Sequence, residues 1–246
     1  MAGFFIPDPR WEMPELLIPG RKPVGPVEID WTSKLITKYK PYHIWVFNDY
    51  GAVDLVTAKE TFYFKGATLN GKDGAHVEGS NNSYIDLMED SSSLPSSGVT
   101  IFLRQDNNNT VNSDNVNGFG VKSTTSTDRL GAHLPYSNGT VYFDHGGIGG
   151  NGRITYSGGA TGSNAWVFKN GSSQRSIWKN GVRVSNASGS LNRSTTSAAF
   201  GLGYHGSNTT NNANQGDYKY MYIFPSMDDA DIELMSSDIY QFLIPK

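Results

Sequence analysis

The sequence contains no cysteine among its 246 residues. A disulfide framework, a thiol nucleophile and a thiolate metal site are therefore excluded. Charged residues are also scarce: Asp, Glu, Lys and Arg make up 17% of the chain, and the formal net charge is −3. Because the chain has no excess of basic residues to neutralise phosphates, we expect no nucleic-acid partner.

Long apolar runs are missing as well. No stretch approaches the roughly 18 apolar residues of a membrane-spanning helix, so we expect no membrane partner. The N-terminal stretch MAGFFIPDPRWEMPELLIPG lacks the basic start of a signal peptide, and prolines interrupt its apolar residues. We therefore expect the protein to be assembled in the cytoplasm of the cell that makes it.

The first 30 residues differ from the rest of the chain, because six of the eleven prolines lie there. Proline at this density disfavours helices and central strands, so residues 1–30 are predicted to form an extended arm rather than part of the domain at 31–246. Large apolar side chains accompany the prolines: Phe4, Phe5, Ile6, Trp11, Met13, Leu16, Leu17 and Ile18. Because disordered tails are usually poor in such residues, we predict that these side chains dock on a partner or a neighbouring copy. The alternative is an unstructured tail.

Residues 31–246 form a succession of short β-prone runs separated by clusters of Gly, Asn, Ser and Thr. The runs are 44–47, 61–64, 84–87, 99–103, 118–122, 129–134, 140–143, 153–156, 165–169, 176–179, 182–185, 198–204 and 218–224. This pattern is typical of antiparallel strands and predicts an all-β sandwich or jelly roll.

A short helix is predicted near the end of the chain, over DADIELMSS (229–237). Ser226 is its expected N-cap. Ile232 and Met235, with Leu234 beside them, should hold the helix against the sandwich.

The stretch SIWKNGVRVS (176–185) predicts a hairpin, because Asn180 and Gly181 suit the positive φ angles of a type I′ turn. Three cross-strand pairs are expected: Lys179 with Val182, Trp178 with Arg183, and Ile177 with Val184. Trp178 and Arg183 should face one side of the sheet, and Ile177, Val182 and Val184 the other. Trp178 and Arg183 could stack and contact a glycan, or they could simply cover the neighbouring residues.

Several stretches resemble a known family, the concanavalin A-like or laminin-G-like jelly rolls, especially the version found in bacteriophage virion proteins. These are HIWVFNDYGAVDL (43–55), LNGKDGAHVEGSNNSYIDL (69–87), WVFKNGSSQRSIWKNGVRVS (166–185), AFGLGYHG (199–206), GDYKYMYIF (216–224) and IYQFLIP (239–245). His76-Val77-Glu78 departs from the family, which more often has an aromatic residue there. The resemblance spans roughly residues 31–246 and implies a jelly-roll sandwich of two antiparallel sheets with a short C-terminal helix, to which the extended N-terminal arm predicted from the prolines is added. No cofactor is expected, but the resemblance makes Asp73 and Asp217 candidate ligands for Ca²⁺.

Catalytic motifs are sparse. Glu28 and Asp30 begin like the alternating carboxylates of a jelly-roll glycosidase, but the third carboxylate is missing. The glycine motifs at 147–152 and 201–206 precede no amphipathic helix and are predicted to be turns. Asp144-His145 has no further metal ligand at a useful spacing, so a satisfied loop pair is expected.

We therefore predict a non-enzymatic structural protein of a bacteriophage virion. In this hypothesis it decorates the capsid, binds the major capsid protein or neighbouring copies through its arm, and exposes a jelly roll that can bind host glycans. Candidate glycan contacts are Trp178, Arg183, Tyr204 and His205. The alternatives are a lectin-like tail or fibre protein and a polysaccharide hydrolase.

Overall fold

The computed structural model describes most of the region that the sequence assigns to the sandwich. The described residues are 36–48, 51–58, 63–65, 67–69, 74–78, 83–108, 118–122, 125–136, 138–147, 152–195, 197–203 and 215–242. The predicted arm, with its docking residues, and the pair Glu28 and Asp30 lie outside them.

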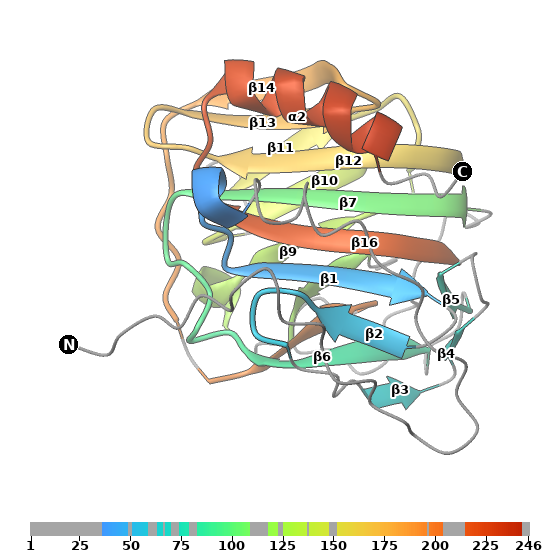
Figure 1. Cartoon of the computed structure of the whole chain (residues 1–246). Coiled ribbons are helices and arrows are strands. Elements are labelled where there is room, and N and C mark those ends of the chain that lie inside the picture. The colour runs from blue at the N-terminus through green and yellow to red at the C-terminus, as the bar shows by residue number, and fades with distance from the viewer. Residues whose placement is uncertain are drawn as a thin grey trace.

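The first sheet has nine strands, with the order β14-β13-β12-β7-β16-β1-β2, and β5 and β4 join it beside β16. Figure 1 looks onto this sheet. Its strands are β1 (His43–Asn48), β2 (Gly51–Asp54), β4 (Ala67–Leu69), β5 (Ala75–Val77), β7 (Val99–Asn108), β12 (Gly162–Asn170), β13 (Gln174–Lys179), β14 (Val182–Ser188) and β16 (Gly216–Pro225).

The second sheet has seven strands and lies behind the first in Figure 1, with the order β11-β10-β9-β8-β15-β6-β3. Its strands are β3 (Tyr63–Lys65), β6 (Tyr84–Asp90), β8 (Phe119–Val121), β9 (Leu130–His133), β10 (Val141–His145), β11 (Arg153–Tyr156) and β15 (Ala199–Leu202). All strand pairs among the described residues are antiparallel, so the predicted all-β sandwich is confirmed. A turn of 3-10 helix, η2 (Ser126–Asp128), precedes β9.

Apolar side chains fill the space between the sheets because successive residues of a strand point to opposite faces. Phe168 of β12 meets Phe119 of β8 across this interior at a ring distance of 5.5 Å. Trp45 of β1 and Phe200 of β15 make a second contact between the sheets, at 6.0 Å. All four rings are almost inaccessible to solvent, so the main core lies here.

A second apolar cluster lies on the outer face of the nine-stranded sheet. Phe102 and Tyr222 point to this face from β7 and β16, opposite to their neighbours in the main core. The helix α2 (Asp229–Phe242) lies across this face in Figure 1. As predicted, Ile232 and Met235 of this helix are buried, at 0% and 2% exposure.

Three details of the predicted helix were wrong. Leu234 is 50% exposed, because it lies on the solvent side of α2. The helix begins at Asp229, so Asp228 rather than Ser226 occupies the position before its first residue, and it continues five residues beyond the predicted end at 237. Within the described residues no helix is long and apolar enough to cross a membrane.

The predicted hairpin is present as the β13–β14 pair. Asn180 and Gly181 have φ angles of 50° and 80°, as a type I′ turn requires. Lys179 pairs with Val182 and Trp178 with Arg183, as expected. The third predicted pair was wrong: a bulge after Ile177 places that residue opposite Ser185 instead of Val184.

Candidate functional site

Trp178 lies within a packed interface. Its ring is 6% exposed and belongs to the apolar cluster beneath α2, and its indole nitrogen donates to the Ser176 hydroxyl at 2.9 Å. Arg183 places its guanidinium carbon 5.6 Å from the Trp178 ring centroid and donates to Asp229 at the start of α2. This arrangement favours the packing interpretation of Trp178 over a glycan platform. The other predicted glycan contacts, Tyr204 and His205, lie outside the described residues.

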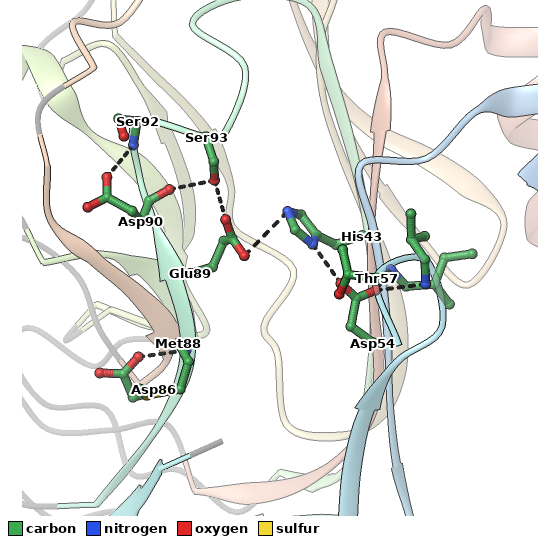
Figure 2. Close-up of polar contacts among 11 residues, drawn as sticks. His43, Asp54, Thr57, Asp86, Met88, Glu89, Asp90, Ser92 and Ser93 are labelled. Atoms are coloured by element: carbon green, nitrogen blue, oxygen red, sulfur yellow. Dashed lines mark hydrogen bonds and ion pairs between the residues drawn. The ribbon is translucent and has the colours of Figure 1, made fainter. Parts of the chain in front are cut away.

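Strand β6 carries three carboxylates that sequence analysis did not single out. A bulge before Glu89 places that residue opposite Phe200, whose side chain is in the core, whereas Asp86 pairs with Gly201. Figure 2 shows the result: Asp86 and Asp90 point away from His43, and Glu89 points toward it. Carboxylates on opposite faces of a strand cannot flank one glycosidic bond, so Glu89 does not form a glycosidase pair with Asp86 or Asp90.

Glu89 takes part in a polar link between the two sheets. Its carboxylate lies 3.9 Å from Nε2 of His43, and Nδ1 of His43 lies 2.9 Å from Asp54 (Figure 2). Burial would raise the pKa of Asp54, but hydrogen bonds from His43, Thr57 and two backbone amides outweigh it and lower this pKa. The side chains of His43, Asp54 and Glu89 are 7%, 3% and 12% exposed. The link therefore stabilises the interior rather than facing a ligand.

The predicted calcium candidate Asp217 lies at the other end of the sandwich, where β5 pairs with β16. Its two carboxylate oxygens lie 2.6 Å from Nδ1 of His76 and 2.6 Å from the side-chain nitrogen of Asn107. No group of three or more His, Asp or Glu side chains suited to a metal ion occurs among the described residues. The second candidate, Asp73, is outside them.

Asp144 and His145 are neighbours in the sequence but point to opposite faces of β10. Asp144 accepts hydrogen bonds from Arg153, whereas His145 is 1% exposed and faces the interior. No described residue forms a hydrogen bond with either ring nitrogen of His145. Burial, together with the positive charges of Arg193 and Arg175, lowers the pKa of His145 to about 3. The prediction of a satisfied loop pair was therefore wrong: both residues lie in strand β10, and of their two side chains only that of Asp144 has a hydrogen-bond partner among the described residues.

The glycine motifs also separate in the structure. Gly147 and Gly152 approach so closely between β10 and β11 that a Cβ on Gly152 would lie 2.4 Å from the Gly147 backbone, which fits the predicted tight turn. In the second motif, Gly201 lies in strand β15, opposite Gly120 of β8, so the prediction of a turn was wrong at that glycine, whereas Gly203 lies in a turn with a φ angle of 79°.

Three aromatic rings form a cluster on the outer face of the seven-stranded sheet. Tyr142 of β10 pairs with His133 of β9, and Tyr136 follows β9 with its ring 5.3 Å from Tyr142 and 5.1 Å from His133. His133 is buried, but both tyrosines are only half-buried. Exposed Asn138 donates its side-chain N–H to the Tyr142 hydroxyl at 2.9 Å. The cluster thus presents two tyrosines toward solvent.

Arg153 of β11 completes this surface because it pairs with Asp144 across the β10–β11 hairpin. Its Nε and Nη2 donate to the two Asp144 oxygens at 2.5 and 2.6 Å, and its guanidinium carbon lies 4.4 Å from the Tyr142 ring centroid. Burial would lower the pKa of Arg153, but Asp144 outweighs it and raises this pKa. We call Tyr136, Tyr142 and Arg153 the tyrosine–arginine patch.

Sequence analysis missed this patch, although a signal was present. In VYFDH (141–145) and RITY (153–156), two β-prone runs flank a glycine-rich turn. Alternation within such a hairpin places Tyr142 and Asp144 on one face. The pairing register, which depends on the turn, was needed to bring Arg153 to the same face.

The chain matches no family model and no curated protein. It is similar in structure to domain 4 of an extracellular GH43 arabinanase from Geobacillus stearothermophilus in complex with arabinotriose, with a TM-score of 0.58 and 13% identity over 80% of this chain and 98% of that domain. The binding domain of botulinum neurotoxin serotype D/C is similar with a TM-score of 0.58 and 14% identity, over 81% of this chain and 52% of that one. Trypanosoma rangeli sialidase is similar with a TM-score of 0.57 and 11% identity, over 81% of this chain and 33% of the sialidase chain. The chain thus spans about half of the toxin domain and a third of the sialidase, and these similarities establish the sandwich fold.

Proposed function

We propose that this chain is a carbohydrate-binding β-sandwich module and that the tyrosine–arginine patch contacts the sugar. The carrying observation is the patch itself: two half-exposed tyrosine rings beside an arginine that Asp144 holds in place. The arabinotriose complex of the similar arabinanase domain supports the proposal, because the same fold there holds an oligosaccharide.

The chemistry of the patch suits a sugar ring, which has apolar C–H faces and a rim of hydroxyl groups. Aromatic side chains cover the apolar faces, and a few fixed polar groups orient the ligand. Tyr136 and Tyr142 supply the rings, and Arg153 supplies directed N–H donors. Exposed Thr155 adds a hydroxyl on the same face, because it pairs with Tyr142 across β10 and β11. The patch is therefore equipped for binding a sugar, and its carboxylate, Asp144, is buried and bound by Arg153.

A glycan array probed with the full chain tests this function, followed by titration calorimetry with the best oligosaccharide. We expect Tyr142→Ala to weaken binding at least tenfold, since a central aromatic contact is typically worth more than 1 kcal/mol. Tyr136→Ala serves as a second variant: this substitution removes the other tyrosine of the patch and leaves the hydrogen bond between Asn138 and Tyr142 in place. The matched control is Tyr42→Ala, which removes a tyrosine that lies just before β1 and is 39% exposed, and it should change affinity less than twofold. Equal losses in Tyr142→Ala and Tyr42→Ala would argue against the patch.

The setting in which the module works is a separate proposal. The resemblance to phage virion domains and the apolar residues within 1–30 support a capsid decoration protein or a tail or fibre protein, assembled in the host cytoplasm. Glycan binding is compatible with either position. Deletion of residues 1–30 should abolish particle association and leave a folded, soluble domain. Particle association that survives the deletion would count against the docking arm.

A further inference from the structure

Arg153 has three recognition surfaces, and two of them are occupied. Its side edge, formed by Nε and Nη2, donates to both oxygens of Asp144. One face of its guanidinium lies over the Tyr142 ring at 4.4 Å. The third surface is the end edge between Nη1 and Nη2, and no described residue accepts a hydrogen bond from Nη1.

The end edge is fixed in orientation and reaches solvent. The Arg153 side chain is 22% exposed, whereas its partner Asp144 is 0% exposed. Because Asp144 holds the guanidinium through two hydrogen bonds, the two N–H groups of the end edge keep one direction without a ligand. Such a fork matches the two oxygens of a second carboxylate.

The charges around Arg153 favour an anion at this edge. Asp144 supplies one negative charge, while Arg129 adds a second positive charge close enough to interact with both Asp144 and Arg153. Arg129 lies beside them because its carbonyl accepts the amide of Gly146 at the end of β10. These three side chains therefore carry a net charge of +1 (two guanidinium groups against one carboxylate).

We infer that the glycan bound by this module is acidic and that its carboxylate docks on the end edge of Arg153. The inference rests on the proposed function and names the class of ligand: an oligosaccharide with a uronic or sialic acid residue. Tyr136 and Tyr142 would then cover the apolar face of the sugar next to the carboxylate. A neutral sugar would leave the fork without a charged acceptor of matching geometry.

The test uses the full chain and an array that holds sialylated, glucuronylated and galacturonylated oligosaccharides beside neutral and sulfated ones. The best carboxylated ligand is then titrated together with its carboxyl-reduced form, in which a primary alcohol replaces the acid. We expect reduction of the carboxyl group to weaken binding at least tenfold. Arg153→Lys, which keeps the charge and loses the fork, should weaken binding of the acidic ligand to a similar degree.

Arg183→Lys is the matched control, because Arg183 also lies over an aromatic ring and pairs with an aspartate. It should leave affinity unchanged within twofold. The reduced ligand keeps the test valid if Arg153→Lys fails to fold. Neutral or sulfated glycans that bind as tightly as carboxylated ones, with a loss in Tyr142→Ala, would overturn the carboxylate assignment and uphold glycan binding. Absence of binding to any glycan would overturn both.

Discussion

The outer faces of the two sheets carry the same trio of residue types in different surroundings. On the nine-stranded sheet, Arg183 lies over Trp178 and pairs with Asp229, which begins the helix α2. On the seven-stranded sheet, Arg153 lies over Tyr142 and pairs with an aspartate of the adjacent strand.

The source of the carboxylate accounts for the difference between the two faces. Asp229 belongs to a helix, so the same residues that bring its charge to Arg183 also cover the Trp178 ring. Asp144 lies in the sheet itself, so it can hold Arg153 without covering Tyr142. An arginine, an aromatic ring and an aspartate therefore form a packed interface in one place and a candidate binding surface in the other.

The largest effect should come from deleting the covered ring. Trp178→Ala removes a buried side chain from beneath α2, and we expect a loss of about 3–5 kcal/mol in the free energy of unfolding. Tyr142→Ala should cost clearly less because its ring is half-buried. Glycan affinity should show the opposite order, with the loss confined to Tyr142→Ala. Urea unfolding and glycan titration of both variants would measure this, and a parallel loss in both properties would break the comparison.

A third arginine, Arg193, forms an ion pair that is fully buried, unlike the partly exposed pairs of Arg153 and Arg183. Arg193 donates to Asp128 at 2.7 Å and to backbone carbonyls at 91, 94 and 95, and both side chains are 0% exposed. Arg193→Met should cost about 3–5 kcal/mol, because it leaves the Asp128 carboxylate without its guanidinium. The double variant Arg193→Met/Asp128→Leu should regain part of that loss in urea unfolding. No recovery would show that the ion pair is not the source of the cost.

The buried His145 should make the free energy of unfolding fall at acidic pH. Its pKa is lowered from 6.5 to about 3 in the folded protein. Between these values the unfolded chain binds a proton that the folded chain does not, so stability falls as pH falls from 6.5 toward 3. Between pH 7 and pH 5 this amounts to about 2 kcal/mol, at about 1.4 kcal/mol per pH unit.

The measurement is urea unfolding of the wild type and of His145→Leu at both pH values. Other titrating groups contribute similarly to the two proteins. The variant should therefore lose about 2 kcal/mol less than the wild type between pH 7 and pH 5. An identical pH dependence would mean that His145 becomes protonated in the folded state.

The smallest effect is expected at the exposed edge of the helix contact. Arg183 is 43% exposed and Asp229 is 31% exposed, so their ion pair is screened by water. Arg183→Gln should change the free energy of unfolding by about 0–1 kcal/mol. A loss of several kcal/mol in thermal or urea unfolding would show that the pair, rather than the apolar cluster, holds α2 in place.

Local pattern predicted much of the fold. The thirteen β-prone runs correspond to strands, because alternation and turn residues act over a few neighbouring positions. The short strands β2, β4 and β5 were not predicted. Each has only three or four residues, which is too few for a clear alternating pattern, and each is recognised as a strand by its pairing with another strand. Bulges such as the one after Ile177 depend on both strands of a pair, so one strand's pattern does not reveal them.

The candidate site was less accessible to sequence analysis. Trp178 and Arg183 were singled out because their cross-strand pairing follows from an Asn-Gly turn. Tyr142 and Arg153 were overlooked because their turn is glycine-rich and sets no obvious register. Tyr136 joins the patch only through the path of the chain after β9.

Sequence pattern alone predicts an antiparallel sandwich, the position of most strands and the hairpin that places Trp178 beside Arg183. These features depend on propensities and on contacts between near neighbours. The covering of Trp178 and the partial exposure of Tyr142 and Arg153 depend instead on how distant parts of the chain pack together. The physical reason is that helix α2, more than 40 residues further along the chain, buries its apolar side chains on one sheet and leaves the other sheet's tyrosine–arginine patch half-exposed.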